Sequence, residues 1–140
     1  KINAPEENAR AILAMLLSAE ANANESATLE MSSLSEITQS LSIDAHYRDL
    51  LNFKILLGSA EIMDLDKRII AFEALSKPGN PFRLLAEEQI ALIELELGNT
   101  DDAIEKISQI LLDSELTTGL RNRVTQMMIA LGKDPELINE

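Results

Sequence analysis

Two stretches of this chain become similar when residues 89–98 are aligned with residues 123–132. In both, apolar residues stand eight, five and one positions before a glycine. These apolar residues are Ile90, Ile93 and Leu97 in the first stretch and Val124, Met127 and Leu131 in the second. The spacing places them on one helix face, and a glycine directly after such a face is typical of a helix end. The pattern therefore predicts two equivalent helices, one ending at Gly98 and one at Gly132.

A third copy of the pattern ends at Gly58. At the same offsets it carries Leu50, Phe53 and Leu57. The interval from Gly58 to Gly98 is longer than the interval from Gly98 to Gly132, because it contains a loop with two prolines and a glycine in residues 77–81. A period of about 34 residues belongs to helical repeats, in which one helix pair cannot bury its apolar face alone and stacks on its neighbours. The sequence therefore predicts an all-α array.

The composition agrees with a helical core. Apolar residues make up 46% of the 140 residues, but only 3% are aromatic. The core must then consist of Leu, Ile, Ala and Met, and no strand-like alternation or Asn-Gly or Asp-Gly hairpin turn occurs. We expect one domain over residues 1–140, made of a divergent first hairpin (1–43), a repeat core (44–132) and a polar tail (133–140).

Apolar spacing and capping residues predict about seven helices. The first expected helix begins at Pro5 and fades in residues 21–24, and the second covers about residues 26–40. The third follows an Asp44 cap and runs to Gly58, and the fourth and fifth cover about residues 62–75 and 82–97. The sixth is capped by Thr100, and the seventh runs from Thr117 or Thr118 to Gly132. The expected buried side of the sixth helix is Ala103, Ile104, Ile107, Ile110 and Leu111.

The charge and the missing cysteines limit the classes of partner. The 24 acidic and 12 basic residues give a net charge of −12, which repels nucleic acid and anionic lipid headgroups. Without cysteine, the chain has no disulfides and no thiolate metal sites. The longest apolar run, residues 11–17, is too short to span a bilayer. Because the chain begins at Lys1 rather than Met, a signal peptide or membrane anchor has room upstream.

The repeat resembles the tetratricopeptide pattern. Ala91 and Ala103 fall on its two small residues, where helix backbones approach closely, and Gly98 falls on its turn glycine. Ile107 stands where that pattern has an aromatic residue, and its tryptophan and tyrosine are missing, so the repeat is divergent. The resemblance implies helical hairpins stacked into a right-handed superhelix.

Residues 47–132 resemble the YfgM-like tetratricopeptide family of Gram-negative bacteria, and the alphaproteobacterial branch in particular. The matching runs are L-L-x-F-K-I-L-L-G, P-G-N-P-F-R, E-L-G-N-T-D-D-A and G-L-R-N-R-V. The resemblance implies an inner-membrane protein with one transmembrane helix, whose repeat domain is periplasmic and works near the Sec translocon and envelope chaperones. Membrane contact would then run only through an anchor outside this chain.

The sequence gives little support for catalysis, and we predict no catalytic residue, metal or cofactor. His46 is the only histidine and reads as a surface residue. We interpret Glu87, Glu88, Glu94 and Glu96 as a solvated helix face, since no histidine shares metal-ligand spacing with them. We interpret Met127 and Met128 as residues of the core and its rim. An enzyme built from scattered Asp and Glu remains the alternative of a different class.

Four polar residues are candidates for a partner-binding groove. Arg48 and Asn52 have the i, i+4 spacing of one helix face, and Gln89 and Arg123 fall at groove positions of the following repeats. Such a set resembles the clamp with which some tetratricopeptide proteins hold a chaperone's C-terminal carboxylate, although Gly119 replaces one basic residue of that clamp. We predict a non-catalytic scaffold that assists translocation or envelope folding. The alternative is a cytosolic chaperone adaptor that uses this groove.

Overall fold

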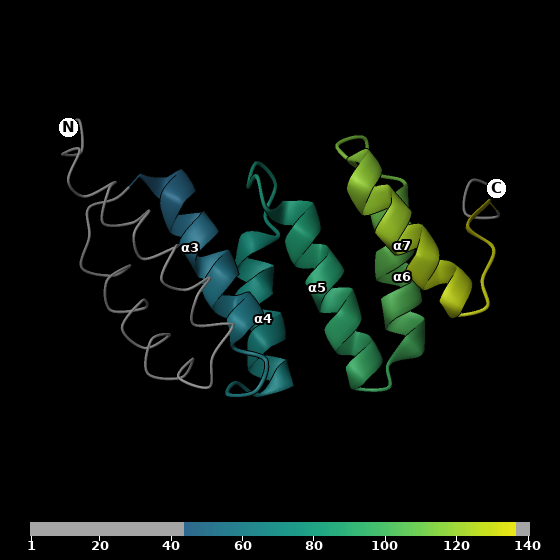
Figure 1. Ribbon diagram of the computed structural model, residues 1–140, viewed down its shortest axis with the longest axis horizontal. Helices are drawn as coiled ribbons and strands as arrows, with labels where there is room; N and C mark the ends of the chain where they lie inside the picture. The colour runs from purple at the N-terminus through teal and green to yellow at the C-terminus, as the bar shows by residue number, and fades with distance from the viewer. Residues whose placement is uncertain (1–43, 137–140) are drawn as a thin grey trace. The chain divides into compact units, whose positions relative to one another are not determined.

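The computed structural model describes residues 44–136, and all regular structure in that range is helical (Figure 1). Its helices are α3 (Ala45–Gly58), α4 (Leu65–Leu75), α5 (Arg83–Glu96), α6 (Thr100–Leu111) and α7 (Thr118–Ala130). The predicted all-α class is confirmed for these residues. The two helices expected before residue 44, and residues 137–140 of the polar tail, lie outside the described range.

The chain divides into two compact units, residues 1–71 and residues 72–140, with the boundary inside α4. In the described part of the first unit, α3 buries Leu51, Phe53 and Leu56. Of the predicted face Leu50, Phe53 and Leu57, only Phe53 is buried, because Leu50 is half-buried and Leu57 is 41% exposed.

The end of α3 differs from the ends of the other two repeat copies. Gly58 is the last residue of the helix, and positive φ angles occur only at Gly79, Gly98 and Gly132 among the described residues. The helix instead closes at Ser59, whose backbone N–H and hydroxyl both donate to the Leu56 carbonyl at 3.3 and 2.8 Å. Gly58 therefore ends its helix without the left-handed turn that its counterparts adopt.

The start of α4 lies later in the chain than predicted. The N–H groups of Ile62 and Met63 both donate to the Ser59 carbonyl, at 3.1 and 3.0 Å. These bonds hold residues 59–63 in a tight turn, so the helix begins at Leu65 and not at Ile62. The predicted end of α4 at Leu75 is confirmed.

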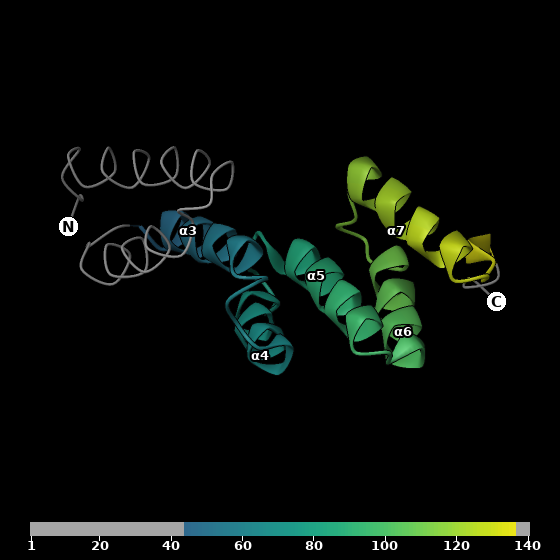
Figure 2. The same cartoon turned by 60° about the horizontal axis from the view of Figure 1, so that its bottom comes forward.

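The core of the second unit is built by α5, α6 and α7. Helix α6 packs against both α5 and α7; Figure 1 shows α7 crossing in front of α6, and Figure 2 shows α6 beside α5 and below α7. Ala91 of α5 and Ala103 of α6 are fully buried, as expected where two helix backbones approach closely. One apolar cluster joins the three helices, namely Leu84, Ala91, Ile107, Ile110, Leu111, Leu120, Val124 and Met128.

The predicted equivalence of residues 89–98 and 123–132 extends to their hydrogen bonds. At the end of α5, the N–H groups of Gly98 and Asn99 donate to the Leu95 and Glu94 carbonyls, at 3.1 and 2.8 Å. The same two bonds recur one period later, at the end of α7. Gly132 donates to Ile129 at 2.9 Å and Lys133 donates to Met128 at 3.1 Å. Both glycines have positive φ, so both helices end in the same glycine turn.

Two details of this prediction are wrong. Thr100 is the first residue of α6 and not its cap, because Asn99 occupies the N-cap position while its side chain donates to Glu94 at 2.7 Å. Leu97, placed on the buried face, is 40% exposed, since the chain is already leaving the helix there. At α7 the expected cap is confirmed, because the Thr117 hydroxyl accepts from the Leu120 N–H at 3.4 Å.

Replacing Gly98 with alanine is expected to destabilise the fold by about 1–2 kcal/mol, because its φ of +83° is unfavourable for a residue with a Cβ. No atom lies within 4 Å of the added Cβ, so the cost comes from the backbone alone. Gly119→Ala is the matched control, since Gly119 is helical and alanine favours a helix by up to about 1 kcal/mol. Thermal melts should shift in opposite directions. Equal shifts would contradict the turn assignment.

Candidate partner-binding site

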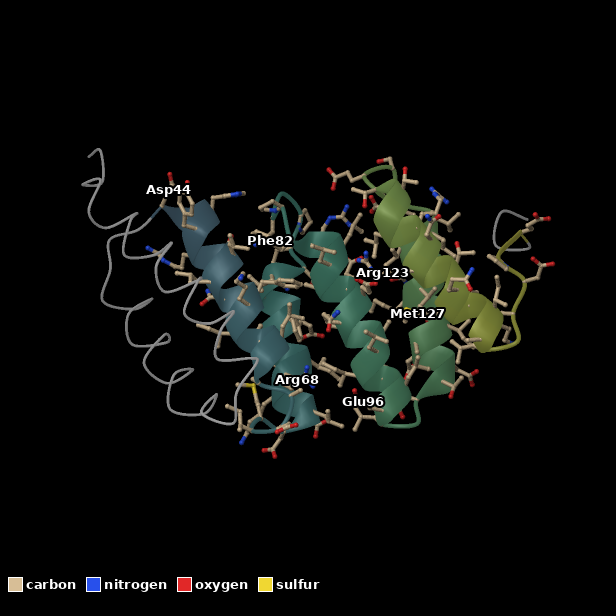
Figure 3. All side chains as sticks on the ribbon, in the orientation of Figure 1. Asp44, Arg68, Phe82, Glu96, Arg123 and Met127 are labelled. Carbon is tan, nitrogen blue, oxygen red and sulfur yellow. The ribbon has the colours of Figure 1, made fainter. Side chains whose placement is uncertain are left out.

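An ion pair between buried Glu88 and exposed Arg123 connects α5 with α7. The carboxylate of Glu88 accepts two hydrogen bonds from Arg123, from Nε at 2.7 Å and from Nη2 at 2.8 Å. The Glu88 side chain is 7% exposed and that of Arg123 is 53% exposed. Hydrogen bonding to Glu88 raises the pKa of Arg123 above its ordinary value. The guanidinium thus covers the carboxylate from the solvent side, with Arg123 on the edge of α7 nearer to α5 (Figure 3).

The ion pair sets two equivalent rows of side chains beside each other. On α5, Gln89, Leu92 and Glu96 follow the i, i+3, i+7 spacing of one helix face. The corresponding residues one period later, on α7, are Arg123, Gln126 and Ala130. We call these six residues the α5–α7 face. Gln89 is half-buried, the other five are exposed, and Leu92 supplies an apolar surface that is 37% exposed.

The four predicted groove residues are divided between the two units. Arg48 and Asn52 lie one turn apart on α3 in the first unit, where Arg48 is exposed and Asn52 is half-buried. Gln89 and Arg123 lie in the second unit, and both belong to the α5–α7 face. The assembly of all four into one groove stays a prediction.

Two charged residues, Glu88 and Arg68, are buried against the expectation from the sequence. Glu88, predicted to lie on a solvated face, is buried, because it lies one turn before Ala91 on the packed side of α5. Arg123 follows Glu88 after about one repeat period, and this spacing is the sequence signal that could have identified the pair. Arg68 of α4 is also only 5% exposed, and its Nε has no hydrogen-bond partner within residues 44–136.

A second cluster of charges fastens the start of α5 to the loop between α6 and α7. Arg83 lies 2.9 Å from Asp113, 2.7 Å from Glu115 and 3.6 Å from Glu87. The Arg83 guanidinium and the Glu115 N–H lower the pKa of Asp113, whereas burial raises the pKa of Glu87 against the opposing effect of Arg83. The P-G-N-P-F-R run thus has a structural role, since its arginine holds together two segments that are distant in the chain.

The remaining candidates offer no reactive arrangement in the described residues. His46 is exposed, and its ring meets that of Tyr47 edge to face, with ring centres 6.2 Å apart. Between residues 44 and 136, no three His, Asp or Glu side chains come together in a way that could hold a metal ion. None of the helices in this range is both long enough and apolar enough to cross a lipid bilayer.

Comparison of the chain with protein-family models, curated proteins and solved structures finds no match.

Asp113→Asn is expected to destabilise the protein by about 1 kcal/mol at pH 7, because Arg83 loses an ionised partner. The folded-state pKa of Asp113 is lowered, so its carboxylate stabilises the fold above the ordinary aspartate pKa, and this contribution is lost as the pH falls through the lowered value. Denaturant unfolding of both proteins, at pH 7 and in acid, measures the effect. The difference between them should shrink in acid.

Glu87→Gln is the matched control, because its effect on the free energy of unfolding is expected to have the opposite sign. Because the pKa of Glu87 is raised, its ionised form costs stability above that raised value, and the cost disappears as the pH falls. This variant should be at least as stable as the wild type at pH 7. An Asp113→Asn effect that stays constant between the two pH values would show that the Arg83 cluster contributes no charge-dependent stability.

Proposed function

We propose that this chain is a divergent tetratricopeptide-like repeat domain, related to the YfgM-like family, that binds protein partners and performs no catalysis. The single observation that carries the proposal is the recurrence of one helix and its glycine turn, at Gly98 and again at Gly132, with the same pair of backbone hydrogen bonds. The full burial of Ala91 and Ala103 at the small-residue positions of the pattern supports it further. We extend this pattern to a right-handed superhelix over the whole chain.

The α5–α7 face is the proposed contact surface. It has an apolar centre at Leu92 with polar side chains around it, which is the usual composition of a protein-binding patch. Two rows of equivalent positions suit an extended or helical polypeptide, because such a ligand presents similar groups at regular intervals. Arg48 and Asn52, one turn apart on α3, are separate candidate contact residues in the first unit.

The proposed setting is the bacterial envelope, with the domain held at the inner membrane by an anchor outside this chain and working on the periplasmic side. A translocon component or an envelope chaperone is then the partner. The cytosolic adaptor that grips a C-terminal carboxylate has less support, because two donor groups of Arg123 are already engaged by Glu88. A clamp residue needs those donors for its ligand.

The test is capture of partners by the Leu92→Arg/Gln126→Arg double variant. Both positions are exposed, so folding should be unchanged, while the affinity for a partner that the wild-type domain captures should fall by about tenfold or more. Ile70→Arg on α4 is the matched control, because Ile70 is 66% exposed and lies outside the face. Charge reversal of Arg123 is a poorer test, since it would place a second carboxylate against buried Glu88.

Detergent extracts of inner membranes and cytosolic extracts are compared as sources of partner, with circular dichroism as the folding control. The proposal predicts a membrane-fraction partner that the double variant loses and Ile70→Arg retains. Capture only from cytosol would favour the adaptor. Equal capture by all three folded proteins would exclude the α5–α7 face as the binding surface.

A further inference from the structure

A pocket of about 330 Å³ lies at the amino-terminal ends of α5 and α7, which begin on the same side of the second unit (Figure 1). Its walls are the loop of residues 79–81, the first turn of α5, and the first turn of α7 with the loop before it. Ligand pockets in proteins have volumes of about 300–1,000 Å³. A pocket at the lower limit suits one inserted side chain better than a large ligand.

The pocket combines an apolar wall with an accessible carboxylate. Leu84 and Leu120 are buried, and Leu85 packs partly buried against the same core. Pro81 adds apolar surface from the loop, and Glu115 lines the pocket with a side chain that is 72% exposed. Such a lining matches a long side chain that buries an aliphatic stem and keeps its charged end near water.

The charges beside the pocket are unbalanced. Arg83 lies 2.9 Å from Asp113, 2.7 Å from Glu115 and 3.6 Å from Glu87, so one guanidinium meets three carboxylates. Arg83 donates to the Oε2 atom of Glu115, on a side chain that stays open to solvent. Helix amino-terminal ends attract anions, but these carboxylates already supply negative charge there. A cation is therefore the ligand that complements the pocket.

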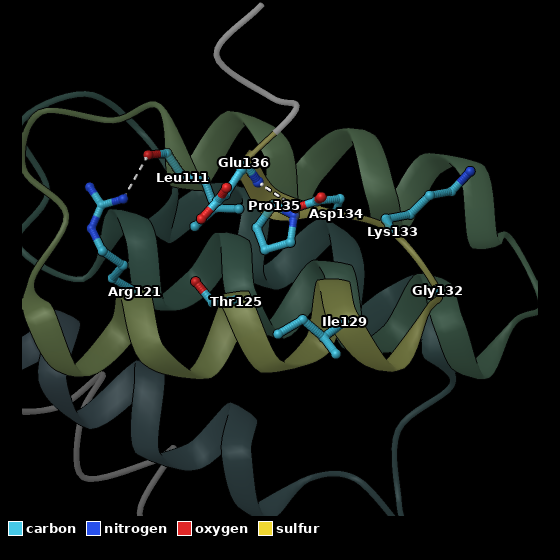
Figure 4. A pocket seen from close by; sticks show the side chains of 9 residues that line it. All are labelled: Leu111, Arg121, Thr125, Ile129, Gly132, Lys133, Asp134, Pro135 and Glu136. Carbon is cyan, nitrogen blue, oxygen red and sulfur yellow. Dashed lines mark hydrogen bonds between the residues drawn. The ribbon is translucent and has the colours of Figure 1, made fainter.

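A wider groove of about 830 Å³ beside α7 lacks this imbalance (Figure 4). Its charged lining residues are two cations, Arg121 and Lys133, and two carboxylates, Asp134 and Glu136. Arg121 donates to the Leu111 carbonyl at 3.5 Å, and the Asp134 carboxylate accepts from the Glu136 N–H at 3.0 Å. The groove selects neither sign of charge, so it is the internal comparison for the pocket.

The pocket continues the α5–α7 face along α5. Leu85 precedes Gln89 by one helical turn and lies on the same side of the helix. A polypeptide that lies along the face would therefore reach the pocket with a side chain at one end.

We propose that this pocket takes an arginine or lysine side chain of the partner polypeptide, with its stem against Leu84, Leu85 and Leu120 and its charged end beside Glu115. The proposal rests on the binding function assigned to the α5–α7 face. It adds the chemistry of the partner, which must carry a basic residue where it passes the starts of α5 and α7.

Nuclear magnetic resonance titration of the full chain with N-acetyl-arginine N-methylamide tests the proposal without a natural partner. The amide signals of Leu85, Thr117 and Leu120 should shift and saturate. The citrulline derivative has the same shape without the charge, and it should bind about threefold more weakly or worse. Equal binding of the two probes would overturn the proposal. Shifts confined to Thr125 and Ile129, beside the wider groove, would also overturn it.

Glu115→Gln should weaken binding of the arginine probe by about threefold or more, because it removes the accessible charge of the pocket. Glu105→Gln is the matched control, since Glu105 is an exposed carboxylate of α6 outside the pocket. Equal losses in both variants would mean that the net charge of −12 attracts the probe without a site, which overturns the proposal. Thermal melts serve as the folding control.

Partner capture plays no part in these titrations. Failure of the α5–α7 face as a contact surface would therefore leave arginine binding at the pocket measurable. Absence of any shift would overturn the pocket assignment alone and leave the capture experiment unaffected.

Discussion

The apolar face of α6 is the constraint on which the packing of the second unit depends. Ala103, Ile107 and Ile110 are completely removed from solvent, and they lie on one side of an otherwise polar helix. A single antiparallel neighbour covers only part of such a stripe, so α6 packs on α5 and on α7 at once. This shared burial is the reason that a helix from the next repeat belongs to the same core.

The Glu88–Arg123 pair adds a directional contact to this non-directional packing. Burial of the Glu88 carboxylate without a partner would be costly, and the two hydrogen bonds from Arg123 satisfy it in one relative position of α5 and α7. Hydrophobic contacts alone tolerate small shifts of one helix along another. In our account the ion pair fixes the register, and with it the spacing of the two side-chain rows on the α5–α7 face.

Periodicity predicted the backbone of the second unit well and its charged contacts poorly. The glycine turns at Gly98 and Gly132 follow from local rules, since few residues other than glycine adopt a positive φ readily. Burial of Ile90, Ile93 and Val124 follows from helical spacing. The exposure of Leu97 and the burial of Glu88 depend on which neighbours cover each turn, and a single helix pattern contains no such information. The Arg83 contacts were missed for the same reason, because its partners Asp113 and Glu115 lie in the loop after α6, distant in the sequence.

A double-mutant cycle on Glu88 and Arg123 measures how strongly the ion pair couples α5 to α7. Unfolding free energies are measured by denaturant for the wild type, Glu88→Gln, Arg123→Gln and the double variant. We expect Arg123→Gln to cost about 2 kcal/mol, because it leaves a buried carboxylate unpaired beside a half-exposed position. The double variant should lose less than the sum of the two single losses, with a coupling of about 1 kcal/mol or more. Additivity within about 0.5 kcal/mol would contradict the account.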